Sequence, residues 1–405
     1  MSNFKALFQY SLAILLVFGI VETLYDPSNG SLGKLLINIC IYISLLFIPF
    51  EKTRGLTQDF SKGITIIIYL LIGYGLINIC RNLDDGQFLS LFGNPYYGPS
   101  FLIPVFILWA TKKNALYWLN RLSLISVQIG IILLFISLSF DLPLPVLCFL
   151  PTFFLLLNYP YVSKNDKVWI ILSTFLGAFV FWQSDMRIGI VRIILCFGIF
   201  IISQLDIKWF YKFSAIVMLS IVVFGATLGV ITGKSLFIEI SSVIESNFNV
   251  TDLATDTRTF LYTEVFSDLD KTDSFILGKG PIGTYYSDYF YFLNDEDGTG
   301  DHHIRHNVEV GVLHYLLKGG VIYLILIAII NIYAIYNALS KVRNRYVRSL
   351  GLLTAANVMV LFIENIPSYS ILFALIWIIT GVCTSKWFKK LNDRQIKLLT
   401  QRLLN

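Results

Sequence analysis

Hydrophobic residues form long uninterrupted runs along this chain. LLINICIYISLLFIPF, ITIIIYLLIGYGLINIC and VIYLILIAIINIYAIYNAL each approach the roughly 20 residues that an α-helix needs to cross a bilayer. We predict spans at about 6–25, 34–50, 64–80, 97–111, 122–140, 142–158, 168–183, 188–203, 213–232, 308–338, 348–366 and 370–385. The pattern therefore predicts an all-α polytopic membrane protein with about 12 transmembrane helices and one long loop outside the membrane.

Composition and charge agree with this prediction. The chain is 56% hydrophobic and 14% charged, whereas a soluble domain is usually about 25% charged. If the N-terminus is cytoplasmic, the segments predicted to be cytoplasmic carry most of the 31 Lys and Arg residues, as the positive-inside rule requires. An even number of spans also places the basic C-terminal tail in the cytoplasm. We expect a multi-pass membrane protein with both termini in the cytoplasm.

The chain divides into three parts around one long polar segment. We expect a membrane region of about nine spans at 1–232, a long outer loop at 233–306, and three spans with a basic tail at 307–405. The loop holds half of the 26 acidic residues and two amphipathic stretches, SLFIEISSVIES and DTRTFLYTEVFSDL. In the second, Asp256 or Thr257 is the expected N-cap, and Leu261, Val265 and Leu269 form one stripe. The glycines of FILGKGPIGTYYS end that helix, and both helices should lie at the outer membrane boundary.

Several arginines lie where a cation is energetically costly. Arg187 begins the eighth span and Arg192 follows inside the apolar run, where a charge usually faces the protein interior and marks a ligand or pathway. Arg258 is predicted in the first turn of a helix, where it opposes the helix dipole and where an anionic ligand would explain it. The structural alternatives are snorkelling, an ion pair of Arg187 with Asp185, and a solvated loop charge at Arg258.

All four histidines lie in DGTGDHHIRHNVEVGVLHYLLKGG. A metal site would draw ligands from His302, His303, His306, Asp301 and Glu309, but the chain has no HExxH motif and no cysteine beside them. We therefore expect no metal.

Acid–base chemistry is the second interpretation of this histidine-rich segment. His306 stands at the mouth of the tenth span, and Glu309 is expected on the same helical face; either could take a hydroxyl proton at a dry boundary. A capping or solvated histidine is the structural alternative. His314 is expected to pack between helices, and Gly319 with Gly320 to permit close helix approach.

The outer half of the membrane thus gathers cations beside a candidate base. The cations are Arg187, Arg192, Arg258, Arg305 and Lys318. Arginine binds phosphate through bidentate, charge-assisted hydrogen bonds. Such a pocket suits a lipid-linked diphosphate that carries a sugar.

Three motifs resemble those of the O-antigen ligase and polymerase superfamily of bacterial inner-membrane proteins. They are QSDMRIG with Arg187, TRTFLYTEVFSDL with Arg258 followed by FILGKGPIGTYYS, and His306-Asn307 followed by GGVIY at 319–323. The resemblance covers the topology of the full chain. Two features depart from the family: Asp185 and Met186 separate Ser184 from Arg187, and the spacing from Asn307 to Gly319 is longer than usual.

The resemblance implies periplasmic glycosyl transfer from an undecaprenyl-diphosphate-linked glycan, without a metal, another cofactor or a nucleotide sugar. Arg187 and Arg258 would bind the diphosphate, Arg192 and Arg305 would assist, and His306 or Glu309 would deprotonate the acceptor. Membrane lipid, a chain-length regulator and a flippase are the implied partners, and no nucleic acid is expected.

The altered spacing favours a polymerase of O-antigen, capsular or exopolysaccharide repeat units over an O-antigen ligase that transfers polymer to lipid A-core. A glycolipid transporter or flippase is the alternative from another class, although transporters usually have inverted repeats and midspan charges. A metal-dependent enzyme would lose activity on chelation.

Overall fold

The computed structural model describes residues 59–83, 88–94, 96–111, 114–140, 143–184, 186–232, 259–287, 304–363 and 367–401. The first two predicted spans, the SLFIEISSVIES helix, the predicted N-cap of the second loop helix, Arg258, Asp301, His302 and His303 lie outside the described residues.

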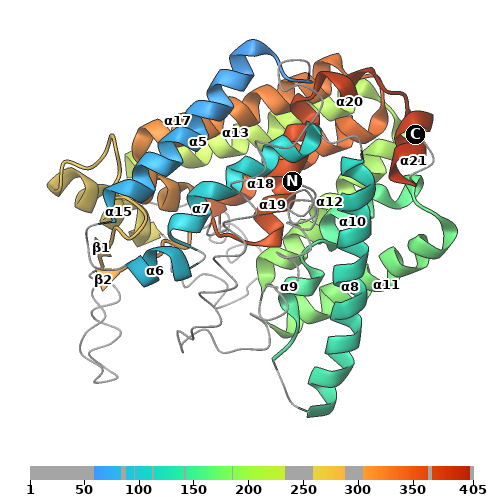
Figure 1. Ribbon diagram of the computed structural model, residues 1–405, viewed down its shortest axis with the longest axis horizontal. Coiled ribbons are helices and arrows are strands. Elements are labelled where there is room, and N and C mark those ends of the chain that lie inside the picture. The colour runs from blue at the N-terminus through green and yellow to red at the C-terminus, as the bar shows by residue number, and fades with distance from the viewer. Residues whose placement is uncertain are drawn as a thin grey trace, which may run out of the picture.

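The described chain is almost entirely helical (Figure 1). Its α-helices are α5 (Lys62–Arg81), α6 (Phe88–Gly93), α7 (Gly98–Leu102), α8 (Ala115–Phe140), α9 (Val146–Phe149), α10 (Thr152–Asn158), α11 (Lys164–Gln183), α12 (Arg187–Leu205), α13 (Lys208–Thr232), α15 (Thr259–Lys271), α17 (Gly311–Lys341), α18 (Arg345–Ile363), α19 (Ile371–Thr384), α20 (Lys386–Lys390) and α21 (Asp393–Thr400). The 3-10 helices are η2 (Ile103–Thr111) and η3 (Tyr159–Tyr161), and two short strands, β1 (Tyr285–Tyr286) and β2 (Ile304–Arg305), pair antiparallel. The predicted all-α class is confirmed for these residues.

Six of the described helices are long and apolar enough to cross a membrane: α5, α8, α12, α13, α17 and α18. The predicted spans at 97–111, 142–158 and 370–385 appear as the shorter apolar helices Gly98–Thr111, Val146–Tyr161 and Ile371–Thr384. Prolines explain part of this shortening, because Pro104 lies in η2 and Pro151 separates α9 from α10. The span expected at 168–183 is the 20-residue helix α11, whose first turns carry Lys164, Asp166 and Lys167. The chain is thus a multi-pass membrane protein.

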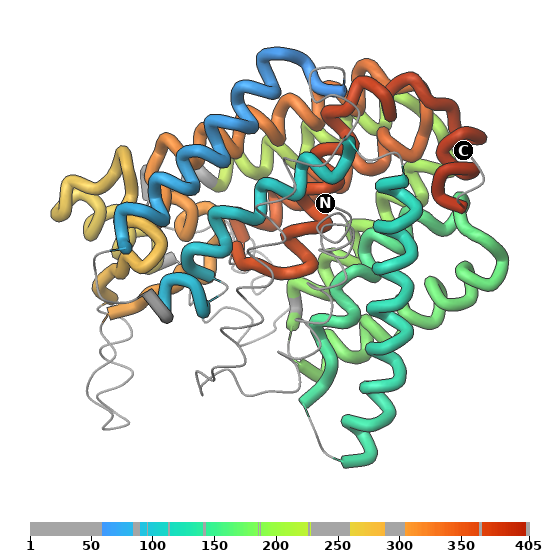
Figure 2. Tube along the Cα trace, viewed as in Figure 1, coloured from blue at the N-terminus to red at the C-terminus, as the bar shows by residue number. Residues whose placement is uncertain are grey.

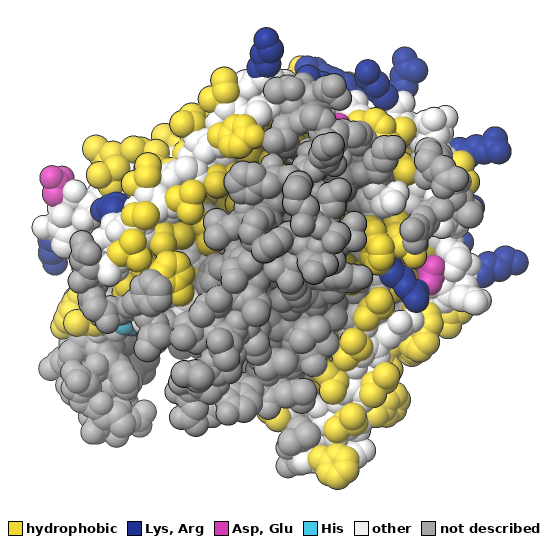
Figure 3. Space-filling model, in the orientation of Figure 1, with side chains coloured by type: hydrophobic (Ala, Val, Ile, Leu, Met, Phe, Trp, Pro, Cys, Tyr) yellow, Lys and Arg dark blue, Asp and Glu magenta, His cyan; other side chains and the backbone are white. Residues whose placement is uncertain are grey.

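Large apolar side chains lie exposed along the outer faces of these helices. They include Ile77 on α5, Phe140 on α8, Phe175 and Trp182 on α11, and Ile194 on α12; Phe175 and Trp182 are each 73% exposed. Figure 3 shows yellow hydrophobic side chains over α5 and α8, and dark blue Lys and Arg along the upper and right rim. A soluble protein rarely leaves so much apolar surface uncovered, so lipid is the expected environment of these faces.

The main core lies where α17, α18 and α19 meet. α17 packs on α18, α19 and α5 (Figure 2). α12 and α13 pack on α18, and α19 packs closely on η2. Gly381 allows that close approach, because a Cβ there would overlap the Ile107 carbonyl oxygen. The core is thus formed by contacts between long, mostly apolar helices.

The helix ends predicted to be cytoplasmic meet one another. Asp206, after α12, forms ion pairs with Arg345 (3.0 Å) and Arg348 (2.8 Å) at the start of α18. Asp393, at the start of α21, accepts hydrogen bonds from the Tyr161 hydroxyl (3.3 Å) and the Arg345 amide (2.8 Å). These contacts tie the basic tail to the end of the bundle and agree with the predicted alternation of sides.

At the opposite end, α15, the strand pair and the start of α17 share a second apolar cluster. Leu261, Val265 and Leu269 of α15 are buried in it, which confirms the predicted stripe. Tyr285 and Val308 complete its centre. The chain that joins the strand pair to α17 in this outer unit carries Arg305, His306 and Glu309 of the predicted site.

Candidate functional site

Helix α17 is broken at Gly320. This residue has φ 68° and ψ −175° inside an otherwise helical segment. A positive φ strongly favours glycine. Gly319 and Gly320 were expected to permit close helix packing, and this interpretation is incomplete because Gly320 changes the direction of the backbone. Residues 321–341 remain as a continuous helix that is long enough to cross a bilayer.

The glycine-rich loop at 274–283 fills the break. Four backbone hydrogen bonds join it to the two helix ends: Lys279 N–H to Leu317 O (2.8 Å), Gly280 N–H to Lys318 O (2.9 Å), Val321 N–H to Phe275 O (3.0 Å) and Ile322 N–H to Ile276 O (3.4 Å). Unpaired backbone groups at membrane depth cost several kcal/mol each. The loop therefore supplies the partners that the break removes.

Helix α5 holds this loop from the side. The Arg81 guanidinium donates to the carbonyls of Leu277 (2.9 Å) and Gly278 (3.0 Å). The Tyr74 hydroxyl donates to the Gly319 carbonyl (2.9 Å), which is another acceptor freed by the break. Arg81 thus has a structural role, because its guanidinium donates to two carbonyls of the loop itself.

Lys318 reaches the loop from inside the bundle. Its side chain is 1% exposed, and its ammonium donates to the carbonyls of Pro281 (2.8 Å) and Gly283 (2.7 Å). The ammonium also lies 4.9 Å from the centre of the Tyr97 ring. A buried ammonium requires such partners.

Glycines at 278 and 280 give the loop its shape. They have φ 67° and φ 81°, values that strongly favour glycine. A Cβ at Gly278 would overlap the Lys318 carbonyl, and one at Gly280 would overlap the Asn82 side chain. A glycine turn is therefore present after α15, and its partner is the break in α17. The expectation that these glycines end the helix is wrong, because α15 already ends at Lys271, just before Asp273 adopts φ 49°.

Strand β2 brings the predicted arginine and histidine beside the loop. Arg305 pairs with Tyr285 across the two strands, so their side chains share one face. His306 follows directly, and its Nδ1 lies 3.3 Å from the Ile282 carbonyl. The His306 ring also lies 5.6 Å from that of Tyr97. Burial lowers the pKa of His306, the Ile282 hydrogen bond raises it, and the nearby Lys318 charge lowers it.

Tyr285 is the centre of a group of charged residues. It is 1% exposed, and its hydroxyl has no hydrogen-bond partner among the described residues. Burial raises the pKa of Tyr285, the charge of Arg305 lowers it, and the charges of Glu264 and Glu309 raise it. Two carboxylates and an arginine therefore lie near this hydroxyl.

Glu309 does not share a helical face with His306. Residues 306–310 are not helical, and α17 begins at Gly311. The expected spacing argument is therefore wrong. The His306 ring packs toward Ile282 and Tyr97, whereas Glu309 lies near Tyr285. His314 holds this bend, because its Nδ1 accepts a hydrogen bond from the Val308 amide (3.4 Å).

The other predicted arginines that the structure describes both lie on α12. Arg187 begins α12, as expected, and Arg192 of the same helix is 5% exposed, so it faces the protein interior as predicted. The main neighbours of α12 are α10, α11 and α18. The described structure places His306 near Lys318 and Tyr97, and it places Arg305 and Glu309 near Tyr285. Arg192 lies on a different helix, α12.

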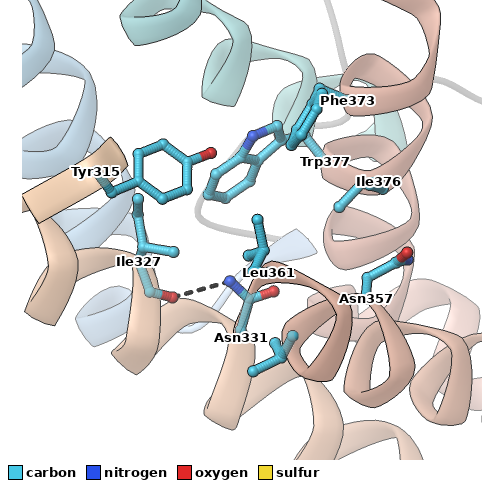
Figure 4. A pocket seen from close by; sticks show the side chains of 9 residues that line it. Tyr315, Ile327, Asn331, Asn357, Leu361, Phe373, Ile376 and Trp377 are labelled. Carbon is cyan, nitrogen blue, oxygen red and sulfur yellow. Dashed lines mark hydrogen bonds between the residues drawn. The ribbon is translucent and has the colours of Figure 1, made fainter. Parts of the chain in front are cut away.

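A small cavity lies beneath the outer unit, between α17, α18 and α19 (Figure 4). Tyr315 and Trp377 point toward each other across it. The side-chain nitrogens of Asn357 and Trp377 have no hydrogen-bond partner within the described part of the chain. Its volume of about 20 Å³ has room for one water molecule.

A metal site finds no support in the described residues, where no three His, Cys, Asp or Glu side chains are grouped to hold an ion. Three of the five ligands that we considered, Asp301, His302 and His303, lie outside those residues.

Sequence reasoning missed Tyr97, Arg81, Glu264 and Tyr285. Arg81 could have been noticed, because it is an isolated cation at the predicted outer end of a span. Glu264 lies on the helix that Arg258 precedes. Nothing in the local sequence distinguishes the two tyrosines from the other 20 in the chain.

Comparison with known proteins adds no relative to this description. None of the protein-family models matches the chain, and no curated protein matches its sequence. Membership of a family is therefore a proposal that rests on the residues described above.

Proposed function

We propose that this protein is a glycosyltransferase of the O-antigen ligase and polymerase superfamily, and that it polymerises lipid-linked oligosaccharide repeat units at the periplasmic face of the inner membrane. One observation carries the proposal: the small outer unit beside the break in α17 holds both a candidate base and charged side chains. The base is His306, whose pKa is lowered by burial, and the charged side chains are Arg305, Glu264 and Glu309 around Tyr285. Exposed Ile276, Leu277 and Ile304 beside this group suit a site at the bilayer boundary.

The reaction needs no cofactor. A hydroxyl oxygen of the acceptor repeat unit attacks the anomeric carbon of the donor, forming a glycosidic bond. The bond from that carbon to the diphosphate breaks, and the undecaprenyl diphosphate leaves with the electron pair. His306 takes the hydroxyl proton, and Glu309 is the second candidate for this role.

Charge on the leaving diphosphate requires cations. We assign Arg258 and Arg187 to it, with Arg305 and Arg192 assisting. Arg258 directly precedes α15, which carries Glu264 toward Tyr285. Arginine stabilises a leaving diphosphate through bidentate, charge-assisted hydrogen bonds.

A strain that lacks this protein tests the proposal through its lipopolysaccharide. We expect lipid A-core bearing a single repeat unit, with the polymer ladder restored by the wild type. Arg258→Ala should reduce the ladder by about 10²-fold at unchanged protein level. Lys271→Ala, which removes an exposed cation at the other end of α15, is the matched control.

Other outcomes identify other functions. Bare core with polymer left on the lipid carrier would indicate the ligase, and repeat units retained on the cytoplasmic side would indicate a flippase. An unchanged ladder together with unchanged capsule and exopolysaccharide would contradict the glycan proposal.

The pH dependence of transfer should follow His306. The charge that acts on it is that of Lys318 on α17, and Tyr97 packs against its ring. Arg305 precedes it on β2 and pairs with Tyr285. Because burial lowers the pKa of His306 from 6.5, the neutral form that acts as base persists below that pH. Transfer by the purified protein should therefore stay constant down to about pH 6.5 and fall only as the pH drops through the lowered pKa. A decline that begins well above pH 6.5 would count against His306 as the base.

A further inference from the structure

A carbonyl oxygen can only accept a hydrogen bond. The contact between His306 Nδ1 and the Ile282 carbonyl at 3.3 Å therefore requires the proton on Nδ1. In the neutral ring, Nε2 then carries the free lone pair. That nitrogen is the one a general base would use.

Lys318 fixes the backbone that carries the Ile282 carbonyl. Lys318 donates to the carbonyls on either side of it, Pro281 at 2.8 Å and Gly283 at 2.7 Å. One buried ammonium thus fixes the carbonyls of the residues before and after Ile282. The charge needs these acceptors, and the loop needs the donors.

Tyr97 completes the arrangement. Its ring lies 4.9 Å from the Lys318 ammonium and 5.6 Å from the His306 ring. It therefore packs against both the cation and the imidazole, and it limits rotation of the imidazole. The histidine, the tyrosine and the lysine come from three separate segments of the chain.

We propose that Lys318 is a positioning residue, which holds the 281–283 backbone so that the Ile282 carbonyl keeps His306 in the Nδ1–H tautomer with Nε2 available as the base. The role of Nε2 as the base rests on the proposed function. The effect of Lys318 on the His306 tautomer does not, because the tautomer can be measured without substrate.

His314 provides an internal reference. Its Nδ1 accepts a hydrogen bond from the Val308 amide at 3.4 Å, so the neutral ring carries its proton on Nε2. The two described histidines should thus be opposite tautomers within one short segment. The chain has only four histidines, so each can be resolved.

The experiment is ¹⁵N NMR of the histidine-labelled full-length protein in lipid bilayers, near neutral pH, with His306→Gln assigning the His306 signals. In the wild type we expect His306 protonated on Nδ1 and not on Nε2. Lys318→Met should abolish this single state, giving a mixture of tautomers. Lys341→Met, the same substitution at the exposed cytoplasmic end of α17, should leave the spectrum unchanged.

Lys318→Arg is the second variant, in case Lys318→Met does not fold. It keeps the charge and the donors, but its wider head must displace the Pro281 and Gly283 carbonyls and so shift the His306 Nδ1 signal. A wild-type His306 protonated on Nε2 would overturn the inference. So would an unchanged His306 signal in either Lys318 variant that folds.

Transfer kinetics separate this inference from the proposed function. A folded Lys318→Met protein should show kcat lowered by about 10²-fold with little change in KM. If the spectra follow expectation while neither wild type nor variant transfers glycan, the proposed function is wrong and the positioning role stands. If transfer depends on His306 while the His306 signals do not change in the Lys318 variants, the positioning role is wrong.

Discussion

His306→Ala is expected to lower the rate of glycosyl transfer by about 10²–10⁴-fold, the usual contribution of a general base. The ring lies at the broken end of α17, with Nδ1 bound to the Ile282 carbonyl and burial favouring its neutral form. Removing it leaves the arginines to bind the diphosphate, so KM should change much less than kcat.

The measurement is the rate at which purified protein in lipid vesicles extends an undecaprenyl-diphosphate-linked repeat unit. His302→Ala and His303→Ala are the matched controls, because they remove neighbouring histidines to which we assign no proton transfer. Both should keep activity within a few-fold of the wild type. If His306→Ala also does so, while Glu309→Gln is inactive, the base is Glu309.

Gly320→Ala is expected to destabilise the protein by about 3 kcal/mol or more. The residue adopts φ 68°, and an added Cβ would overlap the Ile276 carbonyl oxygen of the inserted loop. A strained backbone costs about 1–3 kcal/mol, and displacement of the loop would also break the hydrogen bonds across the gap. Both effects act on the folded state alone.

The control for Gly320→Ala is Gly198→Ala on α12. A Cβ at Gly198 meets nothing within 4 Å, and alanine is favoured over glycine inside a helix by about 1 kcal/mol. Thermal unfolding in detergent, followed by the loss of monodisperse protein, should show a lower midpoint for Gly320→Ala and an equal or higher one for Gly198→Ala. Equal midpoints for wild type and Gly320→Ala would show that the break carries no constraint.

The helical class and the general order of spans could be predicted because a bilayer leaves few alternatives. Backbone groups must be paired inside the segment, and runs of apolar residues mark those segments. The stripe of Leu261, Val265 and Leu269 was equally readable, since helical spacing alone places the three on one face. Their burial agrees with it.

The sequence was less informative about where helices stop. Arg187 begins α12 as predicted, whereas α17 begins at Gly311 and not at residue 308. Its start depends on a contact between His314 and the Val308 amide. Such a contact has no local signature, and it decides whether Glu309 shares a face with His306.

The sequence by itself determined a multi-pass helical membrane protein, a glycine turn after an amphipathic helix, and the concentration of histidines at one membrane entrance. Only the tertiary structure decided that the glycine turn enters a break in α17, and that Lys318 supports the carbonyl beside His306. Hydrophobic runs are local signals, because each helix meets the bilayer on its own. Pairing the freed backbone groups of one segment with those of another about 40 residues away is a long-range match, and it exists only once the helices have packed.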